Sequence, residues 1–128
     1  MDLGEFNTSD AHEEGADVTI THPITRQPTD VVITVKGCDS IAFRSAKKAM
    51  ERKTFQAMAA GKDIDDEFAE NLEIGILVAV TTGWSGLVED GKPVKFNEKN
   101  VRRLYTLSPP VRDQVDRFMS SRRNFTKG

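Results

Sequence analysis

The stretch Thr82-Gly-Trp-Ser-Gly-Leu-Val-Glu-Asp-Gly-Lys-Pro-Val-Lys-Phe96 separates two helical parts of the chain and contains its only tryptophan. The apolar run Ile74–Val80 leads into it. Gly83 is expected to end the incoming helix, because glycine adopts the left-handed backbone conformation without steric cost. Asp90-Gly91 is a strong signal for a tight β-turn. Pro93 lacks a backbone donor and limits any strand pairing here to a short edge.

Trp84 is expected at the corner where the incoming helix, the turn and the next helix meet. A large indole is usually mostly buried, which favours a role in closing a small core. Tryptophan is also enriched in interface hot spots, which favours a contact with a partner protein. The sequence leaves both interpretations open.

Length and composition predict one soluble domain. A chain of 128 residues can bury its own core. The net charge of -2, with 30% charged residues, shows no bias toward nucleic acid or anionic membranes. The single Cys38 excludes an intramolecular disulfide and a four-thiolate zinc site. No apolar run reaches the length of a membrane span, and the acidic N-terminus differs from a signal peptide. We therefore expect a cytoplasmic protein.

Three regions are expected along the chain: a mobile acidic tail over residues 1–16, a single α-rich domain over 17–120, and a basic tail over 121–128. The tail prediction rests on the few apolar side chains before residue 17, which bury too little surface to offset ordering. Val18–Thr21 and Val31–Val35 alternate apolar and polar residues, as half-buried strands do. They predict an antiparallel pair joined by a long loop.

Four helices are expected after this pair, each with a recognisable start. They span Ser40 to about Ala60 with Asp39 or Ser40 as its cap, Ile64–Thr82 with Asp63 as its cap, Asn97 to about Tyr105, and a last helix opened by Ser108-Pro109. The half-helix Ile74–Val80 is apolar nearly all round and is expected to be the most buried. The fold class is therefore α+β, mainly α: a small N-terminal antiparallel β unit, about four helices, and a short β-turn insertion around Trp84–Phe96.

The sequence predicts no catalytic, metal or cofactor site. His12 and His22, the only histidines, fall in the expected tail and loop, whereas a metal or general-base role needs converging partners. Cys38 has no histidine close in sequence and is expected to be an idle or buried thiol.

Basic residues of the first long helix give a competing interpretation. Arg44, Lys47, Lys48 and Lys53 form a stripe typical of a nucleic-acid-binding face. An ordinary solvated helix face carries the same pattern, and the acidic balance of the whole chain favours that interpretation.

Several short segments occur here in a combination that we recognise. They are Thr21-His-Pro-Ile-Thr, Gly37-Cys-Asp-Ser, Gly83-Trp-Ser-Gly-Leu, Glu89-Asp-Gly-Lys-Pro-Val-Lys-Phe-Asn and Val111-Arg-Asp-Gln-Val. In this combination the chain resembles the tail assembly chaperones of long-tailed (siphovirus-type) bacteriophages and prophages, over about Thr19 to Phe125. The Gly-Trp and Asp-Gly-Lys-Pro-Val-x-Phe segments are the most specific part.

The resemblance implies a small, non-enzymatic assembly factor in the host cytoplasm. It implies binding to the tape-measure protein, whose long helical segments it keeps soluble, and recruitment of tail-tube subunits through a frameshifted longer form. It also implies self-association and absence from the finished virion. Two alternatives stay open: a small nucleic-acid-binding or regulatory protein that uses the basic first helix, and a structural tail or head-completion subunit.

A chaperone of this kind needs exposed apolar and aromatic side chains for its client. Methionines on helix faces adapt to varied surfaces, although they also pack cores. The predicted contact residues are Phe55, Met58, Trp84, Phe118, Arg122, Arg123 and Phe125.

Overall fold

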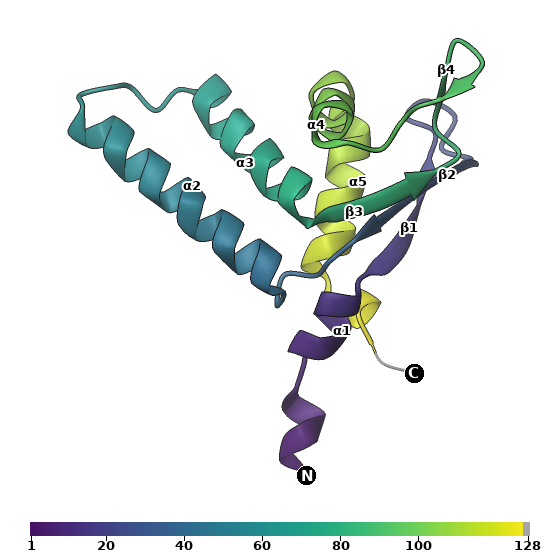
Figure 1. Ribbon diagram of the computed structural model, residues 1–128, viewed down its shortest axis with the longest axis horizontal. Helices are drawn as coiled ribbons and strands as arrows, with labels where there is room; N and C mark the ends of the chain where they lie inside the picture. The colour runs from purple at the N-terminus through teal and green to yellow at the C-terminus, as the bar shows by residue number, and fades with distance from the viewer. Residues whose placement is uncertain (127–128) are drawn as a thin grey trace.

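The chain folds as an α+β protein with a three-stranded antiparallel sheet, long helices and a small β-hairpin (Figure 1). The structure is a computed structural model and describes residues 1–126. Its elements are η1 Leu3–Phe6, α1 Ser9–Glu14, β1 Ala16–Thr21, β2 Pro28–Val35, α2 Ile41–Ala59, α3 Asp66–Val80, β3 Thr81–Ser85, β4 Val88–Glu89, β5 Lys92–Pro93, α4 Glu98–Leu107, α5 Pro109–Ser120 and η2 Arg122–Asn124. The fold class expected from the sequence is confirmed.

The sheet contains the predicted strand pair and one further strand. β2 lies in the centre and pairs antiparallel with β1 and with β3. The alternation of β2 places Ile33 and Val35 in the core, where both are fully buried. The third strand widens the sheet beyond two strands, and a sheet of three strands is more stable than an isolated pair.

The sequence predicts that Gly83 ends the incoming helix, and the structure shows that it does not. Helix α3 already ends at Val80, and Thr81 is extended with φ -81° and ψ 121°. Gly83 lies inside β3 and pairs with Thr34 of β2. The pairing partner lies far away in the sequence, so the local glycine signal gave the wrong stop.

Helices α2 and α3 form an antiparallel hairpin that projects from the body of the molecule (Figure 1). Ser40 caps α2 as expected, and its hydroxyl accepts from the Phe43 amide. The cap of α3 is Asp65 rather than the predicted Asp63, since the Asp65 carboxylate accepts from the Phe68 amide at 2.8 Å. We call this hairpin the arm.

Helices α4 and α5 close the core against α3 and the sheet. Asn97 and Ser108 cap them as predicted, and Pro109 occupies the first turn of α5. The core combines residues of the sheet, of the helices and of both terminal segments: Ala11, Val18, Ile20, Ile33, Val35, Ile74, Leu77, Val80, Val101, Tyr105, Val111, Val115, Met119 and Phe125. At its centre the Tyr105 hydroxyl lies 2.7 Å from the Thr81 hydroxyl.

The N-terminal segment contradicts the prediction of a mobile tail up to residue 16. Residues Ser9–Glu14 form α1, and its Ala11 and His12 are buried. A Cβ at Gly37 would overlap the His12 imidazole, so the missing side chain lets the helix approach. Composition could not reveal this burial, because the covering groups come from distant parts of the chain.

The C-terminal segment is also more ordered than a basic tail. Phe125 is 5% exposed and belongs to the core, directly after the short helix η2. Lys127, which the sequence placed in the same tail, lies outside the described residues. Among residues 1–126, no helix combines the length and apolar character needed to cross a membrane.

Candidate functional site

A groove runs along the arm between α2 and α3. It encloses about 380 Å³ and is lined mainly by small and apolar side chains. Its lining consists of Ala46, Ala49, Met50 and Lys53 of α2, Phe68, Asn71, Leu72, Gly75, Ile76 and Ala79 of α3, and Arg102 of α4. We call it the arm groove.

A second hollow adjoins the arm groove between α3 and the start of α4. It encloses about 370 Å³, and Gly75, Ala79 and Arg102 line both hollows. Phe96 and Val78 add apolar surface on this side. The two hollows together follow one side of α3.

The arm groove is open because its walls carry little side-chain volume. Ala46, Ala49 and Ala79 present only methyl groups, and a Cβ placed on Gly75 would meet nothing within 4 Å. Two helices pack at interaxial distances of about 8–10 Å, with the shorter distances at small side chains. A surface of this kind suits a helix laid into the groove.

The apolar half-helix Ile74–Val80, expected to be the most buried, borders this opening on one side. Ile74, Leu77 and Val80 point into the core, but Ala79 is exposed and Gly75 and Ile76 are only half-buried. The apolar surface is therefore wider than the core needs. Its remainder faces the arm groove.

The tip of the arm exposes large apolar side chains. Phe55 is 73% exposed, Met58 63% and Ile64 41%. Burying a side chain of this size contributes about 1.5–3 kcal/mol. Grouped exposure of this kind marks an interaction surface more often than scattered single residues do. Of the predicted contacts, Phe55 and Met58 are therefore placed on an accessible surface.

The two helices of the arm carry opposite charges. All five basic residues of α2 (Arg44, Lys47, Lys48, Arg52 and Lys53) are exposed. The acidic residues Asp66, Glu67, Glu70 and Glu73 follow α3. The arm groove is bordered by Lys53 and Arg102, so its edges are positive.

Trp84 ties the β-hairpin to the sheet. Its indole nitrogen donates to the Val94 carbonyl at 3.0 Å, and its ring meets Phe96 edge-on at 5.2 Å between centroids. The side chain is half-buried. Of the two sequence interpretations, this geometry favours the structural one.

The remaining predicted contacts gather near the C-terminus, and only some of them are accessible. Phe118 is half-buried and meets Phe125 at 5.7 Å between ring centroids. Phe125 stacks on His12 at 4.7 Å, so it is a core residue and does not form part of an exposed surface. Arg122 and Arg123 are exposed, and Arg122 is engaged by Asp39.

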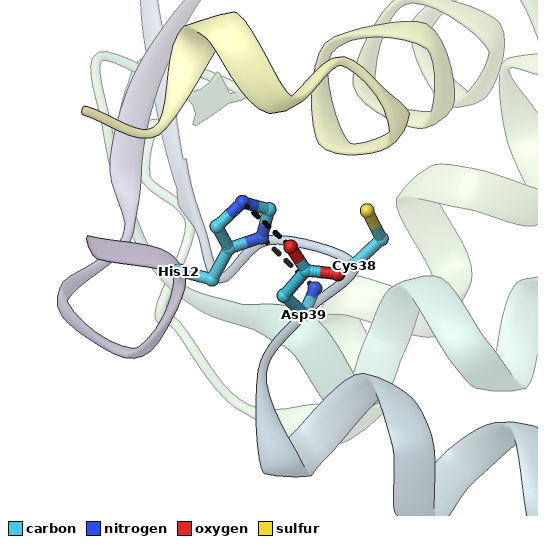
Figure 2. Close-up of side chains that lie close together, drawn as sticks. All are labelled: His12, Cys38 and Asp39. Atoms are coloured by element: carbon cyan, nitrogen blue, oxygen red, sulfur yellow. Dashed lines mark hydrogen bonds and ion pairs between the residues drawn. The ribbon is translucent and has the colours of Figure 1, made fainter. Parts of the chain in front are cut away.

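Figure 2 shows a cluster that the sequence did not predict, formed by His12, Cys38 and Asp39. One imidazole nitrogen, the thiol sulfur and a carboxylate oxygen lie within 4.8 Å of one another. This donor set is one that zinc uses. The expectation that neither His12 nor Cys38 has converging partners is therefore wrong.

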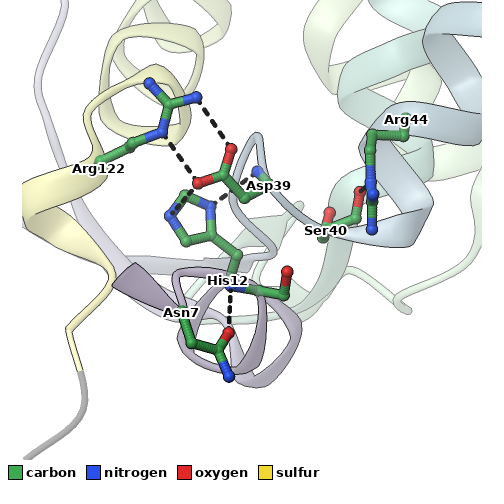
Figure 3. Close-up of polar contacts among 7 residues, drawn as sticks. Asn7, His12, Asp39, Ser40, Arg44 and Arg122 are labelled. Atoms are coloured by element: carbon green, nitrogen blue, oxygen red, sulfur yellow. Dashed lines mark hydrogen bonds and ion pairs between the residues drawn. The ribbon is translucent and has the colours of Figure 1, made fainter. Parts of the chain in front are cut away.

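The hydrogen bonds of this cluster join separate segments of the chain (Figure 3). The Asp39 amide donates to His12 Nδ1 at 2.9 Å, so a neutral imidazole carries its proton on Nε2, which lies 3.5 Å from Asp39 Oδ2. Arg122 donates to both carboxylate oxygens of Asp39. His12 Nδ1 and both carboxylate oxygens of Asp39 thus have hydrogen-bond partners within the chain, whereas His12 Nε2 is buried without one among the described residues.

The junction joins three distant segments: α1, the loop after β2, and η2. Asp39 lies 27 residues from His12 and 83 from Arg122. The hydrogen bonds from Arg122 are the main cause that holds the pKa of Asp39 far below its usual range, and a hydrogen bond from Thr8 acts in the same direction. We call His12, Asp39, Arg122 and Phe125 the terminal junction. No local sequence signal could have revealed it.

Comparison of this chain with protein-family models, curated proteins and solved structures gives no significant match.

Proposed function

We propose that this protein is a tail assembly chaperone of a long-tailed bacteriophage or prophage. In this proposal it binds the tape-measure protein, keeps it soluble and helps to recruit tail-tube subunits in the host cytoplasm. The sequence resemblance motivates the proposal. The observation that carries it is the open, apolar arm groove, together with the exposed Phe55 and Met58 at the arm's tip.

The arm groove supplies the physical means for such a task. A long helical client exposes apolar stripes that aggregate unless they are covered. A groove with alanine and glycine walls accepts one turn after another of an amphipathic helix, and Met50 and Met58 adapt to differing side chains. Lys53 and Arg102 at the edges favour a client helix with acidic flanks. No chemical step is required, so the proposed role is non-enzymatic.

Two further features belong to the proposal. The tail-tube protein is contacted through a frameshifted longer form of the chain, and copies of the chain associate with one another. The protein leaves before the tail is complete, which separates this role from that of a structural tail or head-completion subunit. Its absence from purified virions tests that distinction.

The direct experiment is co-expression with the tape-measure protein of the same genome. The soluble fraction of the tape-measure protein should rise, and the two proteins should co-purify. Gly75→Leu should abolish both effects, because the new side chain fills the open groove. Ala69→Leu is the matched control, since Ala69 is an exposed position of α3 that does not line the groove. Co-purification that is unaffected by Gly75→Leu would remove the groove from the proposal.

A nucleic-acid-binding role is the second candidate, because Arg44, Lys47, Lys48 and Lys53 are all exposed along α2. It predicts binding to duplex or single-stranded DNA that weakens steeply with salt. Electrophoretic mobility shifts at 50 mM and 200 mM salt, with Lys47→Glu/Lys48→Glu as the comparison, separate this role from the first. Absence of any shift at the lower salt excludes it.

A further inference from the structure

A separate hollow lies where α2, α3 and α5 meet, and it differs in charge from the arm groove. It encloses about 230 Å³. Its lining residues are Phe43, Glu73, Ile76, Leu77, Arg112, Asp113, Asp116, Met119 and Ser120. We call it the acidic pocket. It is smaller than the roughly 300–1,000 Å³ typical of sites for small-molecule ligands, and its size suits one long side chain.

The acidic pocket has an apolar floor and a negative rim. Leu77 and Met119 are buried in the core, with Phe43 and Ile76 packed half-buried beside them. The rim consists of the carboxylates of Glu73, Asp113 and Asp116, which are exposed. Within residues 1–126, these three carboxylates form no hydrogen bond and no ion pair.

Arg112 is the one cationic residue that lines the acidic pocket, and its guanidinium group interacts with groups outside the pocket. Arg112 donates to Glu70 at 3.0 Å and to the Tyr105 carbonyl at 3.2 Å. Arg117 attracts the Asp116 carboxylate electrostatically, but it does not line the pocket. The rim therefore carries negative charge that its own lining does not neutralise.

The like charges on this rim repel one another, which raises the free energy of the folded chain. Asp113 and Asp116 lie three residues apart on α5, where like charges destabilise a helix. Partial desolvation of its carboxyl, and secondly the neighbouring Asp113, raise the pKa of Asp116 above its usual value. A cation placed between the carboxylates would relieve both effects.

We propose that the acidic pocket binds the side chain of an arginine or lysine presented by a partner protein. The methylene stem of that side chain packs on the half-buried Phe43 and Ile76. Its charged end lies between Glu73, Asp113 and Asp116. Arginine and lysine commonly combine an apolar stem with a charged end in this way. This contact is distinct from the arm groove and does not depend on the proposed client.

The probe is N-acetyl-arginine amide, and its neutral counterpart is N-acetyl-citrulline amide. Each is titrated into the full-length protein, and ¹H–¹⁵N NMR spectra follow the backbone amides. The arginine compound should shift amides around residues 73, 113 and 116, and it should bind about tenfold more tightly than citrulline at low salt, as expected for a charge-assisted contact. The difference should shrink as salt is added.

Asp113→Asn/Asp116→Asn should remove the preference for arginine over citrulline. Glu51→Gln/Glu67→Gln is the matched control: it removes two exposed carboxylates outside the acidic pocket and should leave the preference unchanged. Far-UV circular dichroism confirms that each variant is folded. Equal binding of the two compounds would overturn the proposal, and so would an equal loss in the control variant. Sedimentation velocity tests whether a side chain of a second copy of this chain binds in the acidic pocket. Self-association of the wild type that is lost in Asp113→Asn/Asp116→Asn would show this, and it would overturn the proposal of a different partner protein.

Discussion

Asp39 and Arg122 form a bidentate ion pair, with Nε and Nη2 each 2.9 Å from a carboxylate oxygen, although the two residues lie 83 positions apart. The pair fixes the C-terminal segment against the loop that starts α2. Asp39 also presents its amide to His12, so one residue organises both ends of the chain. The terminal junction therefore depends on contacts between distant parts of the chain.

Arg122→Ala should lower the free energy of unfolding because it removes a bidentate pair, and the loss should be small because the arginine is largely exposed. The effect should depend on pH. Arg122 depresses the folded-state pKa of Asp39, so the stabilisation is present above the unfolded pKa of about 3.9 and is lost as the pH falls toward the folded value. Urea denaturation of both proteins between pH 6 and pH 2 measures this. If the difference in the free energy of unfolding between wild type and Arg122→Ala grew as the pH fell, the predicted direction of the pH dependence would be contradicted.

His12→Ala should lower the free energy of unfolding by about 2–4 kcal/mol, since it leaves a cavity beside Phe125 and an unpaired Asp39 amide. Glu14→Ala, at an exposed position of the same short helix, is the control and should change stability by less than about 0.5 kcal/mol. Equal effects of the two substitutions would show that α1 does not pack as described. Chemical denaturation followed by circular dichroism is the measurement.

The Tyr105 hydroxyl should lose its proton at a higher pH than an exposed tyrosine does. Burial raises its pKa to about 12, and it is the only tyrosine in the chain, so tyrosinate absorbance near 295 nm reports this residue alone. The unfolded chain loses the same proton near pH 10. The folded state therefore holds the proton more tightly, and stability should fall as the pH rises above about 10. A titration midpoint near 10 in the folded protein would contradict the burial of this side chain.

Gly75→Ala should raise the free energy of unfolding by about 0.5–1 kcal/mol. Glycine in a helix interior is less favourable than alanine by about that amount, and the added Cβ meets no neighbour within 4 Å. Thermal unfolding compared with the wild type measures the gain. A loss of stability would mean that the groove around Gly75 is narrower than the structure shows.

Local signals predicted the parts of the fold that are decided locally. The caps at Ser40, Asn97 and Ser108 satisfy amides within three residues, so the sequence around each cap was sufficient. The turn at Asp90-Gly91 follows from positive φ values of 51° and 77°, which these two residue types tolerate well.

Features that depend on distant partners could not be predicted in this way. Gly83 has the composition of a helix stop but lies in a strand, because β2 offers it a pairing partner. His12 lies in a polar segment, yet it is fully buried by Asp39 and Phe125. Phe55 and Met58 were predicted contacts and are exposed, but the arm groove beside them depends on the spacing of α2 and α3, which the sequence does not reveal.

The central claim is that the arm groove holds a helix of the tape-measure protein. The most direct measurement is the affinity of the purified protein for overlapping fragments of that protein, compared between wild type, Gly75→Leu and Ala69→Leu. We predict that at least one amphipathic fragment binds wild type and Ala69→Leu equally and binds Gly75→Leu at least about tenfold more weakly, a loss of about 1.4 kcal/mol. Equal affinity of all three proteins for every fragment, or no binding to any fragment, would contradict the claim.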